Sequence, residues 1–203
     1  FTTPSTASTD PFGGSGPSYS YNGTDNALQI NATTQGLVPA NGQSWCVEGF
    51  WYQTDSNPYP RLFSIWSAGS GEALGISLEG GTMYFWENGG VLTSTVKPNS
   101  LGWNHFAMNS DGTSVYCWLN GNQVSGTGGA LPDISGRTLY IGVNATDALP
   151  YCAFGGFMNS FRWTLGNQVY TGNFTVPTSA LQTTQASDTN INAITSGQVK
   201  LLM

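Results

Sequence analysis

The sequence has few charges and no long apolar run, and these absences exclude two classes of partner. Charged residues make up 8% of the 203 residues, against roughly 25% in an ordinary soluble domain. Five basic residues and a net charge of −6 cannot supply the patch that a nucleic-acid backbone or an anionic membrane attracts. No apolar stretch approaches the roughly 18–20 residues that cross a bilayer. We therefore expect neither a nucleic-acid nor a membrane partner.

Cysteine and histidine are also scarce. The three cysteines, Cys46, Cys117 and Cys152, are far apart and form no Cys-x-x-Cys pair, which argues against a zinc or redox motif. We expect buried free thiols and at most one disulfide. The chain has one histidine, His105, and no Gly-x-Ser-x-Gly motif, so serine hydrolysis is not expected. His105 is interpreted as a packed or hydrogen-bonded histidine of a sheet.

The carboxylates do not form a recognisable catalytic or metal-binding motif. A glycosidase needs two carboxylates about 5–10 Å apart, and none of the four glutamates lies in such a motif: Glu48, Glu72, Glu79 and Glu87. Calcium needs six to eight oxygens, whereas the seven aspartates are scattered and Asp111 fits a turn. We predict no enzyme, no catalytic residue and no cofactor. A calcium site stays open, but the metal ligands are unknown.

Turn residues and aromatics dominate what remains. The clearest segment is Trp103–Val124, in which Asp111-Gly112 and Asn120-Gly121 are typical hairpin turns. Between the turns, apolar residues alternate with Tyr116 and Trp118, as in a strand with two different faces. With 27 glycines and 13% aromatic residues, this pattern predicts an all-β chain folded as an antiparallel two-sheet β-sandwich.

Other short apolar segments predict further strands, and no segment has convincing helical periodicity. The expected strands are 27–30, 45–53, 61–67, 73–78, 82–86, 91–96, 139–143, 154–165 and 199–203. Residues 1–20 are rich in Ser, Thr, Pro and Gly and predict an extended arm or linker. We expect the sandwich over 21–179 and an extended C-terminal segment over 180–203. The first residue, Phe1, favours a processed product or a segment of a longer polypeptide.

Three segments resemble one family. Trp45–Tyr52, Trp103–Val124 and the closing strands Leu139–Gly142 and Phe154–Trp163 resemble, in order and spacing, the laminin-G-like branch of the concanavalin A-like jelly rolls. The resemblance covers roughly Tyr19–Ser179. It implies the jelly-roll fold and a non-catalytic adhesion module.

The ending Val169–Thr178 is similar to that of laminin-G-like modules in bacteriophage and large algal-virus structural proteins. This resemblance implies a virion structural module at the virion surface, as a capsid decoration, fibre or tail protein. Its terminal arms would bind neighbouring virion proteins in an oligomeric assembly, and it would also contact host-surface glycans. The alternative is a carbohydrate-binding, lectin-like module of a secreted or cell-surface protein.

Glycan binding needs exposed aromatic rings and polar groups that reach sugar hydroxyls. Two aromatic pairs each share one face of a predicted strand: Tyr84 with Trp86, and Tyr116 with Trp118. Either pair could fill the sandwich interior or form a sugar-stacking surface on an outer face. These four residues are the predicted glycan-binding residues, and the loop residues Tyr59, Asn57 and Asn88 are weaker candidates.

Overall fold

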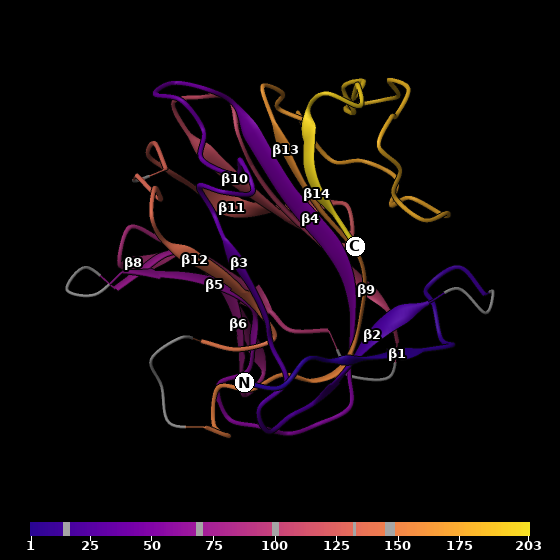
Figure 1. Ribbon diagram of the computed structural model, residues 1–203. Coiled ribbons are helices and arrows are strands. Elements are labelled where there is room, and N and C mark those ends of the chain that lie inside the picture. The colour runs from indigo at the N-terminus through magenta and orange to yellow at the C-terminus, as the bar shows by residue number, and fades with distance from the viewer. Residues whose placement is uncertain (14–16, 68–70, 99–101, 132, 145–148) are drawn as a thin grey trace.

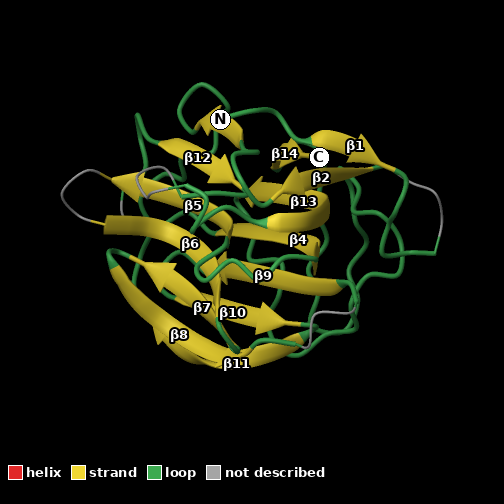
Figure 2. Cartoon of the chain, turned by 90° about the horizontal axis from the view of Figure 1, so that it is seen from below, coloured by secondary structure: helices red, strands yellow, loops and turns green. Residues whose placement is uncertain are grey.

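The computed structural model consists of β-strands and connecting loops (Figures 1 and 2). It describes residues 1–13, 17–67, 71–98, 102–131, 133–144 and 149–203. Within these ranges no helix is long and apolar enough to cross a membrane. The strands are β1 (Ser5–Ala7), β2 (Ser18–Asn22), β3 (Leu28–Asn31), β4 (Trp45–Gln53), β5 (Arg61–Ser67), β6 (Gly71–Glu79), β7 (Thr82–Glu87), β8 (Gly90–Val96), β9 (Asn104–Ser110), β10 (Val115–Leu119), β11 (Asn122–Gly128), β12 (Thr138–Ile141), β13 (Gly155–Leu165) and β14 (Val199–Leu202).

The strands form two antiparallel sheets that pack face to face. The larger sheet has the order β1-β2-β13-β4-β9-β10-β11, and β14 also pairs with β13. The smaller has the order β3-β12-β5-β6-β7-β8. Figure 1 shows them as two layers, with β4, β10 and β13 in one and β5, β6 and β12 in the other. This arrangement confirms the predicted all-β two-sheet sandwich.

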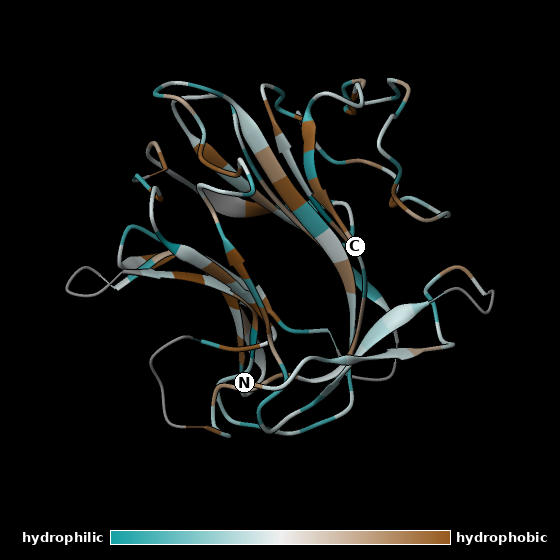
Figure 3. Ribbon diagram, in the orientation of Figure 1, coloured by the Kyte–Doolittle hydropathy of each residue, from teal (hydrophilic) through white to brown (hydrophobic). Residues whose placement is uncertain are grey.

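The inner faces of both sheets carry the hydrophobic core, and Figure 3 shows apolar residues along the strands of both layers. Large side chains of the two sheets meet there, including Phe63 and Phe106, whose ring centroids are 5.9 Å apart. Trp45 and Trp163 stack at 6.1 Å on neighbouring strands of the larger sheet. The two-residue period of each strand sends every second side chain into this layer. The sandwich is therefore held together mainly by buried apolar surface.

A smaller hydrophobic cluster lies on the outer face of the larger sheet. Its buried members are Cys46, Ala107, Trp118, Val169, Tyr170 and Ile194. Residues 166–198 cover this face in loops and isolated bridges before β14 pairs with β13. Figure 1 shows this yellow segment on the side of the larger sheet that faces away from the smaller one. The C-terminal segment, residues 166–203, thus packs on the sandwich of its own chain.

The structure contains two strands that the sequence did not predict. β1 and β2 pair with each other, and β2 pairs with Gly155–Met158 of β13. Residues 1–20 lack apolar alternation because their strand residues are mostly Ser, Thr and Tyr. Backbone hydrogen bonds to an existing sheet edge stabilise them instead, and those bonds are invisible in a local sequence pattern. By contrast, β4 and β5 have the predicted bounds.

The three cysteines are buried free thiols, as expected. Burial raises the pKa of Cys46 and Cys117 well above the usual value. A protonated and enclosed thiol is a poor nucleophile and a poor metal ligand. The cysteines therefore act as small hydrophobic residues here.

Candidate functional site

The outer face of the smaller sheet presents one of the two predicted aromatic pairs. Along β7, Met83 and Phe85 point into the core, whereas Tyr84 and Trp86 point outward and are half-buried. The ring centroids of Tyr84 and Trp86 lie 6.3 Å apart at an interplanar angle of 43°. The structure thus places this pair on the surface and not in the interior.

A chain of hydrogen bonds fixes the orientation of Trp86. Its indole Nε1 donates to Ser77 Oγ at 2.8 Å, and Ser77 Oγ donates to Glu79 Oε1 at 2.7 Å. The guanidinium of Arg61 lies 5.6 Å from the centre of the Trp86 ring, within the range of a cation–π contact. The ring is therefore held in one position before any ligand arrives, which reduces the entropy cost of binding.

Arg61 lies between two glutamates. Its Nε is 3.4 Å from Glu72 Oε2, and its Nη1 is 3.1 Å from Glu79 Oε1. Nη1 also donates to the backbone carbonyl of Tyr59 at 3.1 Å. The Arg61 and Glu72 side chains are 9% and 2% exposed, but Glu79 is 22% exposed. Glu79 is therefore the carboxylate of this ion-pair cluster that solvent reaches most easily.

Strand pairing explains why these residues meet. In the register of β5, β6 and β7, Arg61 lies opposite Ser77, and Ser77 lies opposite Tyr84. Gly75 lies in the neighbouring row, between Ser64 and Trp86. A side chain on Gly75 would collide with Glu72 Oε1, so this glycine leaves the space that the Glu72 carboxylate occupies. We call Arg61, Glu72, Ser77, Glu79, Tyr84 and Trp86 the Arg61 surface.

A further aromatic residue lies on the same sheet. Tyr140 of β12 is half-buried and opposite Ser64 of β5. Its ring contacts Phe1 edge-on at a centroid distance of 5.8 Å. Tyr59, a weaker sequence candidate, is 50% exposed and joined to Arg61 through its backbone. Asn57 instead serves the fold, because its Nδ2 donates to two backbone carbonyls.

The second predicted pair lies on the other sheet and is largely covered. Trp118 is 1% exposed, and its Nε1 donates to the carbonyl of Gly172 at 2.9 Å. Phe174 and Tyr170 pack against the same indole. The expectation that Trp118 forms an open platform is therefore wrong in this structure, because a segment some 50 residues later covers it. Tyr116 stays half-buried, with its hydroxyl 3.3 Å from Asp111 Oδ2.

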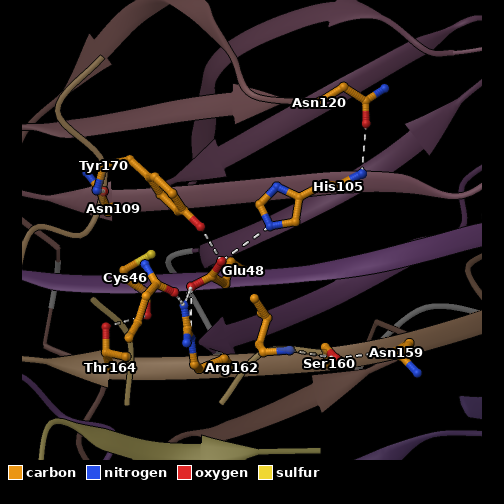
Figure 4. Close-up of polar contacts among 12 residues, drawn as sticks. Cys46, Glu48, His105, Asn109, Asn120, Asn159, Ser160, Arg162, Thr164 and Tyr170 are labelled. Atoms are coloured by element: carbon orange, nitrogen blue, oxygen red, sulfur yellow. Dashed lines mark hydrogen bonds and ion pairs between the residues drawn. The ribbon is translucent and has the colours of Figure 1, made fainter. Parts of the chain in front are cut away.

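Beneath that covering segment lies a buried polar cluster (Figure 4). Glu48 of β4 accepts hydrogen bonds from Arg162 Nε at 3.0 Å and from Tyr170 Oη at 2.5 Å. His105 Nε2 is 3.3 Å from the same carboxylate. Burial alone would raise the pKa of Glu48, but Arg162, His105 and Tyr170 outweigh it and lower the pKa to about 2.

This buried cluster ties the C-terminal segment to the sheet. Arg162 also donates to the carbonyl of Gln182 and to Gln185 Oε1. The side chains of Glu48, His105 and Arg162 are 0% exposed, so no ligand can reach them in this structure. The prediction that His105 is a hydrogen-bonded sheet histidine is confirmed.

A groove of about 330 Å³ lies on the outer side of the larger sheet. Its walls include Phe12 from the N-terminal segment and Pro177 from the C-terminal segment, and Trp103 also contributes. Trp103 is half-buried, and its ring centroid is 6.0 Å from that of Tyr52. This groove offers aromatic side chains but, among them, no ion pair like that of the Arg61 surface.

The described residues contain no group of three His, Cys, Asp or Glu side chains that could hold a metal ion. Several aspartates accept local hydrogen bonds: Asp25 from Thr2 and Asn22, and Asp133 from Ser135. Asp111 Oδ1 accepts bonds from the backbone N–H groups of Thr113 and Ser114. Calcium binding stays an untested prediction.

The fold and the Arg61 surface define a two-sheet sandwich domain with an aromatic and charged outer face. A profile of the concanavalin A-like lectin/glucanase superfamily, of the laminin-G type, matches residues 22–164. The chain therefore belongs to this superfamily. A comparison with curated protein sequences finds no match.

Solved structures share the fold at low sequence identity. Domain 4 of the extracellular arabinanase AbnA from Geobacillus stearothermophilus, in complex with arabinotriose, has a TM-score of 0.57 at 20% identity, over 82% of this chain and 77% of that one. The CBM40 domain of a Ruminococcus gnavus sialidase, bound to α2,3-sialyllactose, has a TM-score of 0.52 at 14% identity, over 79% and 92%.

The LG4–5 domains of the mouse laminin α1 chain have a TM-score of 0.52 at 12% identity and are matched over 71% of this chain. The match spans 40% of that two-domain laminin fragment. At these identities the likeness concerns the fold, and the site of this chain must be judged on its own residues.

Proposed function

We propose that the chain is a non-catalytic carbohydrate-binding module that acts outside the cell. The observation that carries the proposal is the Arg61 surface, in which Trp86 and Tyr84 are half-buried and oriented beside charged hydrogen-bonding groups. Sugar sites combine aromatic walls with a few fixed polar groups. Two neighbours of the same fold, the arabinanase domain and the CBM40 domain, are described in complex with saccharides, which supports this class of ligand.

The charges at the surface favour binding over hydrolysis. A glycosidase needs one carboxyl that keeps its proton near neutral pH. Both carboxylates of this surface, those of Glu72 and Glu79, are engaged in ion pairs with Arg61. We therefore expect saccharides to bind without turnover, measured as the absence of newly released reducing ends during prolonged incubation.

The test is affinity electrophoresis and calorimetry against a panel of polysaccharides, with Trp86→Ala as the main variant. The expected result is binding by the wild type and a loss of roughly tenfold or more in the variant, because a central aromatic anchor is removed. Trp103→Ala is the matched control, since it removes a half-buried tryptophan from the groove on the opposite sheet. Loss of binding in Trp103→Ala with normal binding in Trp86→Ala would move the site to that groove.

The predicted role in a virion has less support. The sequence expectation that terminal arms dock onto neighbouring subunits is untested, but β2 and β14 both pair with β13 of the same chain. None of the similar structures named above is described as a viral protein. The lectin-like alternative of the sequence analysis is therefore the function we favour.

A further inference from the structure

We infer that the Arg61 surface selects uncharged saccharides and rejects anionic ones, such as uronates, sialosides and sulfated sugars. This inference rests on the proposed function, because it names the ligand class of the same surface.

The charge of the surface is negative. Arg61 carries one positive charge and is held by two carboxylates, those of Glu72 and Glu79. An anion that approaches Arg61 therefore meets a cluster with a net charge of −1, and Glu79 is its more exposed carboxylate. Sites that bind sugar acids need an uncompensated cation, because an arginine already paired with carboxylates attracts a further anion only weakly.

No other basic side chain is placed to compensate. All five basic residues of the chain lie in the described ranges, and four of them are engaged elsewhere. Arg162 is buried against Glu48, and Lys97 Nζ donates to Gln53 Oε1 of the other sheet. Lys200 Nζ donates to the carbonyl of Gly197. Hydrogen bonds from Ser135 lower the pKa of Asp133, and Arg137 lies close enough to this carboxyl to lower the pKa further. The field of the whole chain, with a net charge of −6, acts in the same direction.

The hydrogen-bonding groups that remain suit neutral hydroxyls. Glu79 uses its Oε1 for both Arg61 and Ser77, so Oε2 is left as an acceptor in the described structure. The Nη2 of Arg61 and the hydroxyl of Tyr84 likewise take part in no hydrogen bond among the described residues. A donor beside an acceptor matches two neighbouring sugar hydroxyls, each of which can donate and accept. The half-buried ring of Trp86 lies next to this pair and can stack on the sugar.

The experiment compares saccharides that differ only in charge. Calorimetric titrations use pairs such as lactose with sialyllactose, methyl-esterified with free oligogalacturonate, and desulfated with sulfated galactan, each at about 20 mM and 500 mM NaCl. For the pair whose neutral member binds, we expect the anionic member to bind roughly 5-fold or more weakly at low salt, with the gap narrowing at high salt as charges are screened. Glu79→Gln should narrow the gap at low salt as well, because it makes the surface neutral.

Three outcomes decide the matter. Tighter binding of a neutral saccharide, with the gap reduced in Glu79→Gln, supports both the ligand class and the site. Equal or tighter binding of an anionic saccharide, abolished by Trp86→Ala and weakened by salt, overturns the inference but leaves the proposed function standing. No binding by any member of the panel overturns both. Thermal unfolding of each variant verifies that it is folded.

Discussion

Glu87 places its carboxyl group on the inner face of β7. It follows Met83 and Phe85 in the inward-pointing row of β7 and is 9% exposed. Its Oε1 has no hydrogen-bond partner in the described structure, and Gly128 lacks the Cβ that would collide with Oε2. Burial raises the pKa of Glu87 to about 7, although a hydrogen bond from the backbone of Gly129 lowers it in part.

The raised pKa predicts a stability that falls with rising pH. Below about pH 4.5 the carboxyl is protonated in both the folded and the unfolded chain, so it has no effect on the free energy of unfolding. Between about pH 4.5 and 7 the unfolded chain ionises first, and the folded state loses relative stability until the folded group ionises too. At about 1.36 kcal/mol per pH unit, the full step would be about 3.4 kcal/mol. Since solvent near the sheet edge screens part of the charge, we expect roughly 1–2 kcal/mol.

The assay is urea unfolding, followed by tryptophan fluorescence, of the wild type and Glu87→Gln at pH 4.5, 6 and 8. Gln has nearly the same shape but no charge, so the two proteins should have nearly equal stability at pH 4.5. At pH 8 the variant should be more stable by about 1–2 kcal/mol, from the linkage of proton binding to folding. Parallel stability curves for the two proteins across this range would refute the reasoning, because they would show that Glu87 ionises alike in both states.

Three further predictions concern other parts of the molecule. Arg162→Met should lower the free energy of unfolding at pH 7 by about 3–5 kcal/mol, because Glu48 is left charged and buried. In chemical denaturation, the double variant with Glu48→Gln should recover part of this loss. If the losses of the two single variants simply added in the double variant, the ion pair would be contradicted. Gly75→Val should abolish saccharide binding, measured by calorimetry, because the new side chain would displace Glu72. The control Gly81→Ala lies in a turn with open space and should leave the affinity within about twofold. Unchanged affinity in Gly75→Val would show that Glu72 is not part of the binding site. The three buried thiols should react with Ellman's reagent only in denaturant, and rapid reaction of the native chain would contradict their burial.

The local sequence pattern was sufficient for most of the sandwich. Alternating apolar residues and Asx-Gly turns gave β4, β5 and the hairpins of β9–β11 close to their observed bounds, because each side chain of a strand must face one of two layers. The same pattern failed for β1 and β2. β2 is stabilised by pairing with β13, a strand about 135 residues later in the chain, and β1 pairs with β2.

The site was only partly predictable. The spacing of Tyr84 and Trp86 shows that they share a face, but their neighbours Met83 and Phe85 are equally apolar, so the spacing cannot say which face is buried. The glutamates of the Arg61 surface belong to no sequence motif, because the register between β5 and β6 brings them to Arg61. Trp118 was a predicted glycan-binding residue, but the structure buries it. The residues that cover it lie about 50 positions later in the chain, so the local sequence does not reveal them.

The sequence by itself determined the class of fold and the absence of a basic surface, because strand periodicity, turn chemistry and net charge are properties of local segments or of the whole composition. Only the tertiary structure decided which aromatic pair is exposed, which carboxylates surround Arg61, and that residues 166–198 cover the larger sheet. These outcomes depend on strand register and on packing between distant segments. A shift of one residue in register would send Tyr84 and Trp86 to the opposite face of the sheet, and the Arg61 surface would lose both aromatic rings.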